Sequence, residues 1–198
     1  MRRSVFVLML VAACALVAAP ASAQVQNHNN WFANAAVGPS FGTLGSTPVV
    51  DASAGYAFTP HISLAGEFGV LPHAPFDKAN VVAPTLGPVA SRSDVHVNAY
   101  HTNANLFVQS SPIGRFDPYA TFGVGAFTGS TVAKSALPGS TLTQYGRETN
   151  FAENFGVGTT YRLTKWLGLN ADYRHFIVNA SETQHVNRFT TGVSLFVK

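Results

Sequence analysis

Apolar side chains recur at every second position through much of this chain. Two neighbouring stretches show the spacing clearly, with apolar side chains at Val50, Ala52, Ala54, Tyr56, Phe58, Ile62, Leu64, Phe68 and Val70. Successive side chains of a β-strand point to opposite faces, so each such stretch would have one apolar face and one mixed face. No part of the chain after residue 23 holds the roughly 18 consecutive apolar residues that indicate a membrane-spanning helix. The sequence therefore predicts an all-β fold.

Eight strands are predicted from this alternation and from the turn residues between the stretches. They cover residues 31–42, 50–58, 62–70, 95–109, 118–132, 154–163, 167–174 and 187–198. The hairpin around residues 164–166 alternates most regularly, whereas 95–109 alternates poorly.

Short and long connections follow each other along the chain. The predicted turns at 59–61, 110–117 and 164–166 are short, while the connections at 72–94 and 133–148 are long. Up-and-down barrels of the outer membrane have short turns at one rim and longer loops at the other. We therefore predict an eight-stranded antiparallel up-and-down β-barrel, with loops at 42–47, 72–94, 133–148 and 178–186 on one side.

The composition favours a barrel that faces lipid. Charged residues make up 11% of the chain, whereas about 25% is usual in a soluble domain. In hydrocarbon every backbone donor and acceptor needs a partner, and strands achieve this only in a closed barrel. Aromatic side chains fall near predicted strand ends, as in the girdles of membrane barrels, at Trp31, Tyr56, Phe58, Tyr119, Tyr161 and Trp166. The alternative is a soluble periplasmic barrel of lipocalin type, with its apolar residues inside around a small apolar ligand.

Residues 1–23 are predicted to be a secretory signal peptide. Arg2 and Arg3 precede an uncharged apolar run, and small residues stand before Gln24. The chain's single cysteine, Cys14, also lies in a lipobox-like context, so lipidation at Cys14 is an alternative to its removal with the signal. Without Arg2 and Arg3, residues 24–198 are close to neutral, and no nucleic-acid partner is indicated.

Two segments resemble a known family. Residues 114–126 (GRFDPYATFGVGA) resemble the fifth-strand signature of small outer-membrane β-barrel proteins, which include the OmpA-like transmembrane domain, and residues 155–176 are similar to the hairpin that follows. Residues 190–197 fit the spacing of that family's assembly signal, and Lys198 stands where a final aromatic residue is usual. The resemblance implies that residues 24–198 form an outer-membrane β-barrel domain. It also implies that this domain contacts outer-membrane lipid and lipopolysaccharide and is folded by the barrel assembly machinery.

The predicted inward faces carry three acidic and three basic residues. An eight-stranded barrel is only wide enough for its own side chains. Buried charges cost less free energy when they are paired, so we expect an interior charge network in a closed lumen. The alternative is a narrow or gated ion path through this network, which consists of Asp51, Glu67, Arg162, Asp172, Arg174 and Arg188.

No catalytic, cofactor-binding or metal-binding residue is predicted. Residues 173–176 resemble the surroundings of the catalytic histidine in outer-membrane lipid A deacylases, but Ile177 stands where that family has its nucleophilic serine. His175 would therefore have no hydroxyl to activate. The remaining candidates for metal ligands, His73, His96, His101 and His185, do not have the spacing of a metal site.

The function predicted from the sequence is that of a non-enzymatic outer-membrane barrel. Its side chains would fill the interior, and its extracellular loops would serve envelope integrity, adhesion or binding. A lipid A-modifying barrel enzyme is kept as an alternative, and the sequence identifies no partner for the loops.

Overall fold

The computed structural model describes residues 31–43, 45–75, 92–135 and 143–197. Within these ranges, no helix is long and apolar enough to cross a membrane. The predicted signal peptide with Cys14 lies outside the described residues. So do residues 76–91 and 136–142 in the middle of the two long predicted loops.

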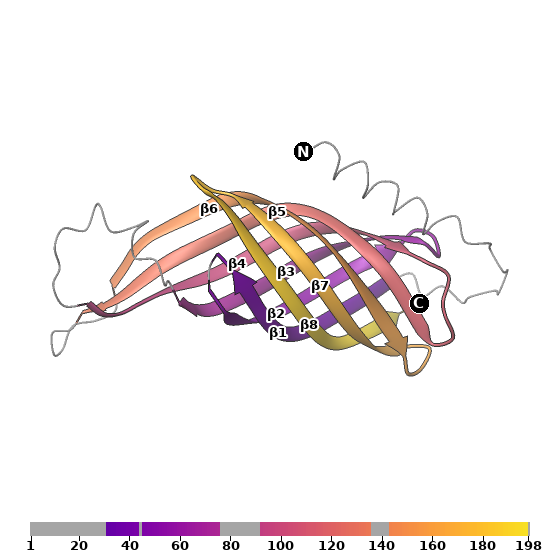
Figure 1. Cartoon of the computed structure of the whole chain (residues 1–198). Coiled ribbons are helices and arrows are strands. Elements are labelled where there is room, and N and C mark those ends of the chain that lie inside the picture. Colours follow the sequence, from indigo (N-terminus) through magenta and orange to yellow (C-terminus); the bar gives the residue numbers. More distant parts are fainter. Residues whose placement is uncertain (1–30, 44, 76–91, 136–142, 198) are drawn as a thin grey trace.

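The described chain forms one closed antiparallel barrel in which sequence neighbours are also spatial neighbours (Figure 1). The first and last strands pair along most of their length and close the cylinder, with Trp31 opposite Val197. This confirms the predicted eight-stranded up-and-down barrel. Its strands are β1 (Trp31–Gly42), β2 (Thr47–Ala57), β3 (Ile62–Pro75), β4 (Arg92–Gln109), β5 (Phe116–Ser135), β6 (Thr143–Arg162), β7 (Leu167–Asn179) and β8 (Thr183–Val197).

The two ends of the barrel differ. Short turns at residues 58–61, 110–115 and 163–166 gather at one end, together with the start of β1 and the end of β8. One of these turns is closed by two hydrogen bonds between Ile113 and Phe116, at 2.8 and 3.1 Å. Gly114 within it has a φ of +65°, which a glycine adopts without a steric penalty. At the opposite end, β4, β5 and β6 extend beyond the other strands (Figure 1).

Strand lengths at that opposite end differ from the prediction. β3 and β4 continue into the predicted loop at 72–94, and β5 and β6 continue into the predicted loop at 133–148. Pairing between strands needs only backbone hydrogen bonds, so a strand can continue where its side chains no longer alternate. Pro72 fits inside β3 because the β3–β4 register shifts between Leu71 and Ala74, a place where prolines are tolerated.

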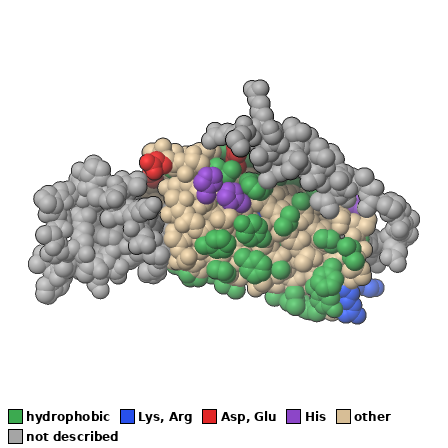
Figure 2. All heavy atoms as spheres, in the orientation of Figure 1, with side chains coloured by type: hydrophobic (Ala, Val, Ile, Leu, Met, Phe, Trp, Pro, Cys, Tyr) green, Lys and Arg blue, Asp and Glu red, His purple; other side chains and the backbone are tan. Residues whose placement is uncertain are grey.

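Large apolar side chains cover the outer wall of the barrel, and polar side chains point inward. Val157 and Trp166 are each 59% exposed, whereas Glu67 and Asp172 are 5% exposed. In Figure 2 apolar side chains are spread over the wall, and charged ones gather towards its two ends. This is the reverse of the soluble lipocalin-type alternative, which requires apolar residues inside and polar residues outside. The predicted faces of residues 50–58 and 62–70 are the ones observed.

Val157 on the outer face of β6 tests whether this wall meets hydrocarbon. We expect Val157→Arg to lower the free energy of unfolding by about 2–4 kcal/mol, the cost of a basic side chain near the bilayer midplane. Val157→Leu, which keeps the surface apolar, should change it by less than about 0.5 kcal/mol. Urea unfolding in lipid bilayers measures both variants. Equal stability of the two would mean that this face does not lie in lipid.

Candidate functional site

Glu67 lies at the centre of the barrel lumen. It points inward from β3, and each of its carboxylate oxygens accepts a hydrogen bond from one arginine. Arg174 on β7 donates from Nη1 to Oε2 at 2.5 Å, and Arg188 on β8 donates from Nη1 to Oε1 at 2.8 Å. All three side chains are at most 5% exposed. The Glu67 carboxylate therefore links β3 to β7 and β8, which are far from β3 in the sequence.

Two aspartates lie close to the arginines that bind Glu67. Asp172 lies 2.8 Å from Nε of Arg174 and 3.6 Å from Nη2 of Arg188, and Asp51 on β2 lies 3.4 Å from Nη1 of Arg188. Tyr119 on β5 donates its hydroxyl to Asp172 at 3.0 Å. Three acids and two arginines thus share the middle of the lumen, and we call these five charged residues the Glu67 network.

Uncharged polar side chains continue the Glu67 network across the lumen. Asn154 on β6 donates to Asn105 on β4 at 3.0 Å, and Asn105 donates to Glu67 at 3.2 Å. His101, also on β4, has its Nε2 atom 3.2 Å from Nη1 of Arg188. Since a guanidinium group only donates, this ring nitrogen is the acceptor.

Glycines on the inward faces make room for these large side chains. A methyl group on Gly156 would lie 2.7 Å from Cγ of Arg174, and one on Gly69 would lie 2.7 Å from Cε1 of His101. A methyl group on Gly123 would meet the two asparagines that lead to Glu67. The repeated sequences 123–125 (GVG) and 156–158 (GVG) therefore combine two inward glycines with one outward valine, each suited to its side of the wall.

Apolar layers close the lumen on both sides of the Glu67 network. Towards the end with the longer connections, inward side chains from seven strands pack into one buried cluster: Val49, Leu71, Ala99, Phe127, Ala152, Phe176, Val178 and Val186. Towards the end with the short turns, Phe107 contacts Phe32 and Tyr119, with ring centroids 6.0 and 5.3 Å apart. The charges are therefore enclosed within the barrel along its axis.

The structure brings five of the six predicted network residues together and places the sixth elsewhere. Arg162 forms an ion pair with Asp117 nearer the short turns, and its guanidinium carbon lies 4.2 Å from the centre of the Phe196 ring. The sequence analysis missed Asp117 as the partner of Arg162, and it missed the side chains that extend the Glu67 network: His101, Asn105, Tyr119 and Asn154. Tyr119 was expected in the aromatic girdle, but it points inward to Asp172. Their inward positions were the available signal, but β4, which carries His101 and Asn105, alternates too weakly to show it.

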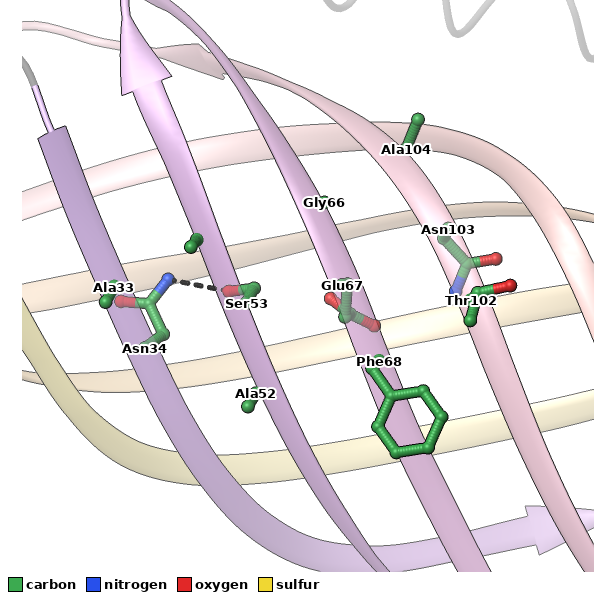
Figure 3. Close-up of a pocket in the computed structure, with 11 residues that line it drawn as sticks. Ala33, Asn34, Ala52, Ser53, Gly66, Glu67, Phe68, Thr102, Asn103 and Ala104 are labelled. Atoms are coloured by element: carbon green, nitrogen blue, oxygen red, sulfur yellow. Dashed lines mark hydrogen bonds between the residues drawn. The ribbon is translucent and has the colours of Figure 1, made fainter.

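A shallow hollow of about 720 Å³ lies over β1 to β4. Small exposed residues line much of it, including Ala33, Ala52 and Gly66. Figure 3 shows the row of polar residues Asn34, Ser53, Glu67 and Asn103 across these strands, with the 3.1 Å bond from Asn34 to Ser53 dashed. The hollow is open and mainly apolar, so it offers a lipid chain a surface rather than an enclosed ligand site.

The histidines considered in the sequence lie in different surroundings. His101 is buried in the lumen, and His185 is exposed on the outer side of β8. The side chains of His73 and His96 lie outside the described residues. His175 is on the outer side of β7 and contacts Asn187 and His185. Across the described ranges, no group of three or more His, Cys, Asp or Glu residues could hold a metal ion.

Glu67 provides a test of the network's contribution to stability. We expect Glu67→Gln to lower the free energy of unfolding by about 3–5 kcal/mol, because it leaves two buried arginines short of a countercharge. Glu182→Gln is the matched control, because Glu182 is exposed in the turn between β7 and β8, and it should cost less than about 0.5 kcal/mol. Urea unfolding gives both values. A similar small loss in both variants would contradict a structural role for the network.

Comparisons with known proteins agree with this architecture. The chain matches the model of the outer membrane protein beta-barrel domain family over residues 9–195. No curated protein matches the chain at a significant level.

Three solved structures are similar in fold. Neisserial surface protein A has 18% identity and a TM-score of 0.58, with 84% of this chain and 95% of that chain covered. Ail, the attachment invasion locus protein of Yersinia pestis, has 11% identity and a TM-score of 0.51, with 84% and 95% covered. A major outer membrane protein from Thermus thermophilus has 14% identity and a TM-score of 0.51, with 85% and 99% covered. At these identities the likeness shows the fold alone, whereas the family match extends over nearly the whole chain. The chain therefore belongs to the outer membrane protein beta-barrel domain family and is a protein of the cell outer membrane.

Proposed function

We propose that this protein is a non-enzymatic integral barrel that holds its extracellular loops at the cell surface, where they serve envelope integrity, adhesion or binding. The observation that supports this most strongly is the filled lumen. Glu67 binds two arginines at its centre, and apolar layers lie on both sides of these charges. A barrel packed in this way is suited to rigid support rather than to transport.

The outer surface supports contact with the lipids of this membrane. Exposed apolar residues form the wall, so we expect acyl chains to cover it and lipopolysaccharide to surround the end with the longer connections. We also propose that the barrel assembly machinery folds the chain, with residues 190–197 at the end of β8 as its recognition signal. This segment pairs with β1 and completes the barrel, as a strand recognised during closure would.

A closed lumen predicts that the protein conducts no ions. In planar lipid bilayers we expect the unmodified protein to give no steady conductance above that of the lipid alone. A variant with Phe127→Ala and Phe176→Ala removes two rings from the apolar layer beside the network, and it should conduct measurably more. Steady channels formed by the unmodified protein would favour the ion path instead.

The surroundings of His175 support a non-catalytic role. The groups that it contacts are the amide of Asn187, the ring of His185 and the ring of Phe155, none of which is a hydroxyl nucleophile. We expect cells that produce the protein to contain lipid A of unchanged mass, and His175→Ala to make no difference. Mass spectrometry of lipid A decides this. Loss of an acyl chain that depends on His175 would establish an enzyme.

The role of the loops is tested by replacing residues 76–91 and 136–142 with short glycine-serine linkers. The shortened barrel should still insert and shift its mobility on heating, because the described strands and the Glu67 network remain. Cells with the shortened protein should lose the surface binding or detergent resistance that the full protein restores to a deletion strain. Full restoration by the shortened protein would show that the barrel, and not its loops, carries the function.

A further inference from the structure

Polar side chains appear on the outer wall of β7 and β8 with increasing distance from the short turns. From the short turns outward, the exposed side chains of these strands are apolar, apart from Thr191, as far as Tyr173 and Phe189, which lie opposite each other at 41% and 45% exposure. The next outward positions are His175 on β7 and the paired Asn187 on β8, followed by Ile177 and the paired His185. The two histidines therefore lie on the outer wall of β7 and β8, farther from the short turns than Tyr173 and Phe189.

These two imidazoles are in direct contact. Nε2 of His175 lies 3.2 Å from Nδ1 of His185, and the two rings are stacked with their centres 5.3 Å apart. Figure 2 shows two histidine side chains together on the outer wall, beside its apolar side chains. The pair is therefore open to the surroundings of the barrel.

The contact has the dimensions of two ligands on one metal ion. Zn²⁺ binds histidine nitrogen at about 2.0–2.1 Å, so two nitrogens at right or tetrahedral angles are roughly 3.0–3.4 Å apart. The separation of 3.2 Å falls within this range. An ion could replace the hydrogen bond between the rings with a small rotation of the exposed side chains.

Asn187 favours the tautomer of His175 that a metal ligand needs. Tyr173 donates its hydroxyl to Oδ1 of Asn187 at 2.9 Å, and Nδ1 of His175 lies 2.8 Å from the same oxygen. The amide oxygen only accepts, so the proton of His175 is on Nδ1 and the lone pair of Nε2 is directed at His185. Metal-binding histidines typically have their second nitrogen held in this way.

From this geometry we propose that His175 and His185 form a two-imidazole site for a divalent transition metal ion of the Zn²⁺ or Cu²⁺ type, on the outer wall of β7 and β8. On binding, the proton of His185 moves from Nδ1 to the exposed Nε2 through water, so that both facing nitrogens donate lone pairs to the ion. Water completes the coordination, because no third His, Cys, Asp or Glu of the described residues joins the pair. Ca²⁺ and Mg²⁺, which prefer oxygen ligands, should not bind there.

The site is tested on the folded, untagged protein in detergent micelles after treatment with a chelator. Isothermal titration with Zn²⁺ should show one ion bound per chain. His175→Ala and His185→Ala should each weaken this binding at least tenfold. His61→Ala is the matched control, since His61 lies in a turn at the opposite end and contacts the carbonyl of Gln109, and it should leave the affinity unchanged. A titration with Ca²⁺ should show no binding at these histidines.

Electron paramagnetic resonance with Cu²⁺ gives a second readout that does not depend on the variants. The bound ion should show hyperfine coupling to two imidazole nitrogens from separate rings, and His175→Gln should reduce this to one. Zn²⁺ affinity that is equal in all variants, or coupling to a single ring in the unmodified protein, would overturn the proposal. A shift in gel mobility on heating confirms that each variant is folded before it is titrated.

Discussion

The structure depends on the hydrogen-bonded closure of β1 against β8. A strand cannot satisfy its own backbone, and hydrocarbon offers no partners, so only a complete cylinder is stable there. Pairing of Trp31 with Val197 and of the residues that follow them leaves no free edge within the wall. Closure with eight strands also fixes the width of the lumen, and at this width the lumen must be filled by the protein's own side chains.

The filling of the lumen explains much of the chemistry on the inward faces. A carboxylate buried alone would be costly, but Glu67 meets two guanidinium groups, and these meet two further carboxylates. Long arginine side chains need space, and glycines such as Gly156 on neighbouring strands provide it. The apolar layers then keep water from the ion pairs, which strengthens their attraction. Along the barrel axis, the charged Glu67 network thus lies between two layers of apolar side chains.

Alternation along the chain was sufficient to predict the strand number, the topology and the outward faces of the most regular strands. It could not predict where the long strands end, since β3 to β6 continue by backbone pairing after the alternation stops. Nor could it predict which inward charges meet. Arg162 and Glu67 both point into the lumen, but the register between strands sets the position of Arg162 along the barrel axis. At that position its partner is Asp117. The contact between His175 and His185 was missed for the same reason, because it crosses two strands diagonally.

Access of water to the lumen tests the closed interior most directly. Thr190 points inward from β8 and is 1% exposed, so a Thr190→Cys variant places a thiol of similar size inside the barrel. Glu182→Cys places one on the exposed turn between β7 and β8. With a membrane-impermeant thiol reagent added to protein in vesicles, the cysteine at 182 should react at once, and the cysteine at 190 should react only after unfolding. Equally fast labelling at both positions would show that water fills the lumen and would contradict the closed barrel described above.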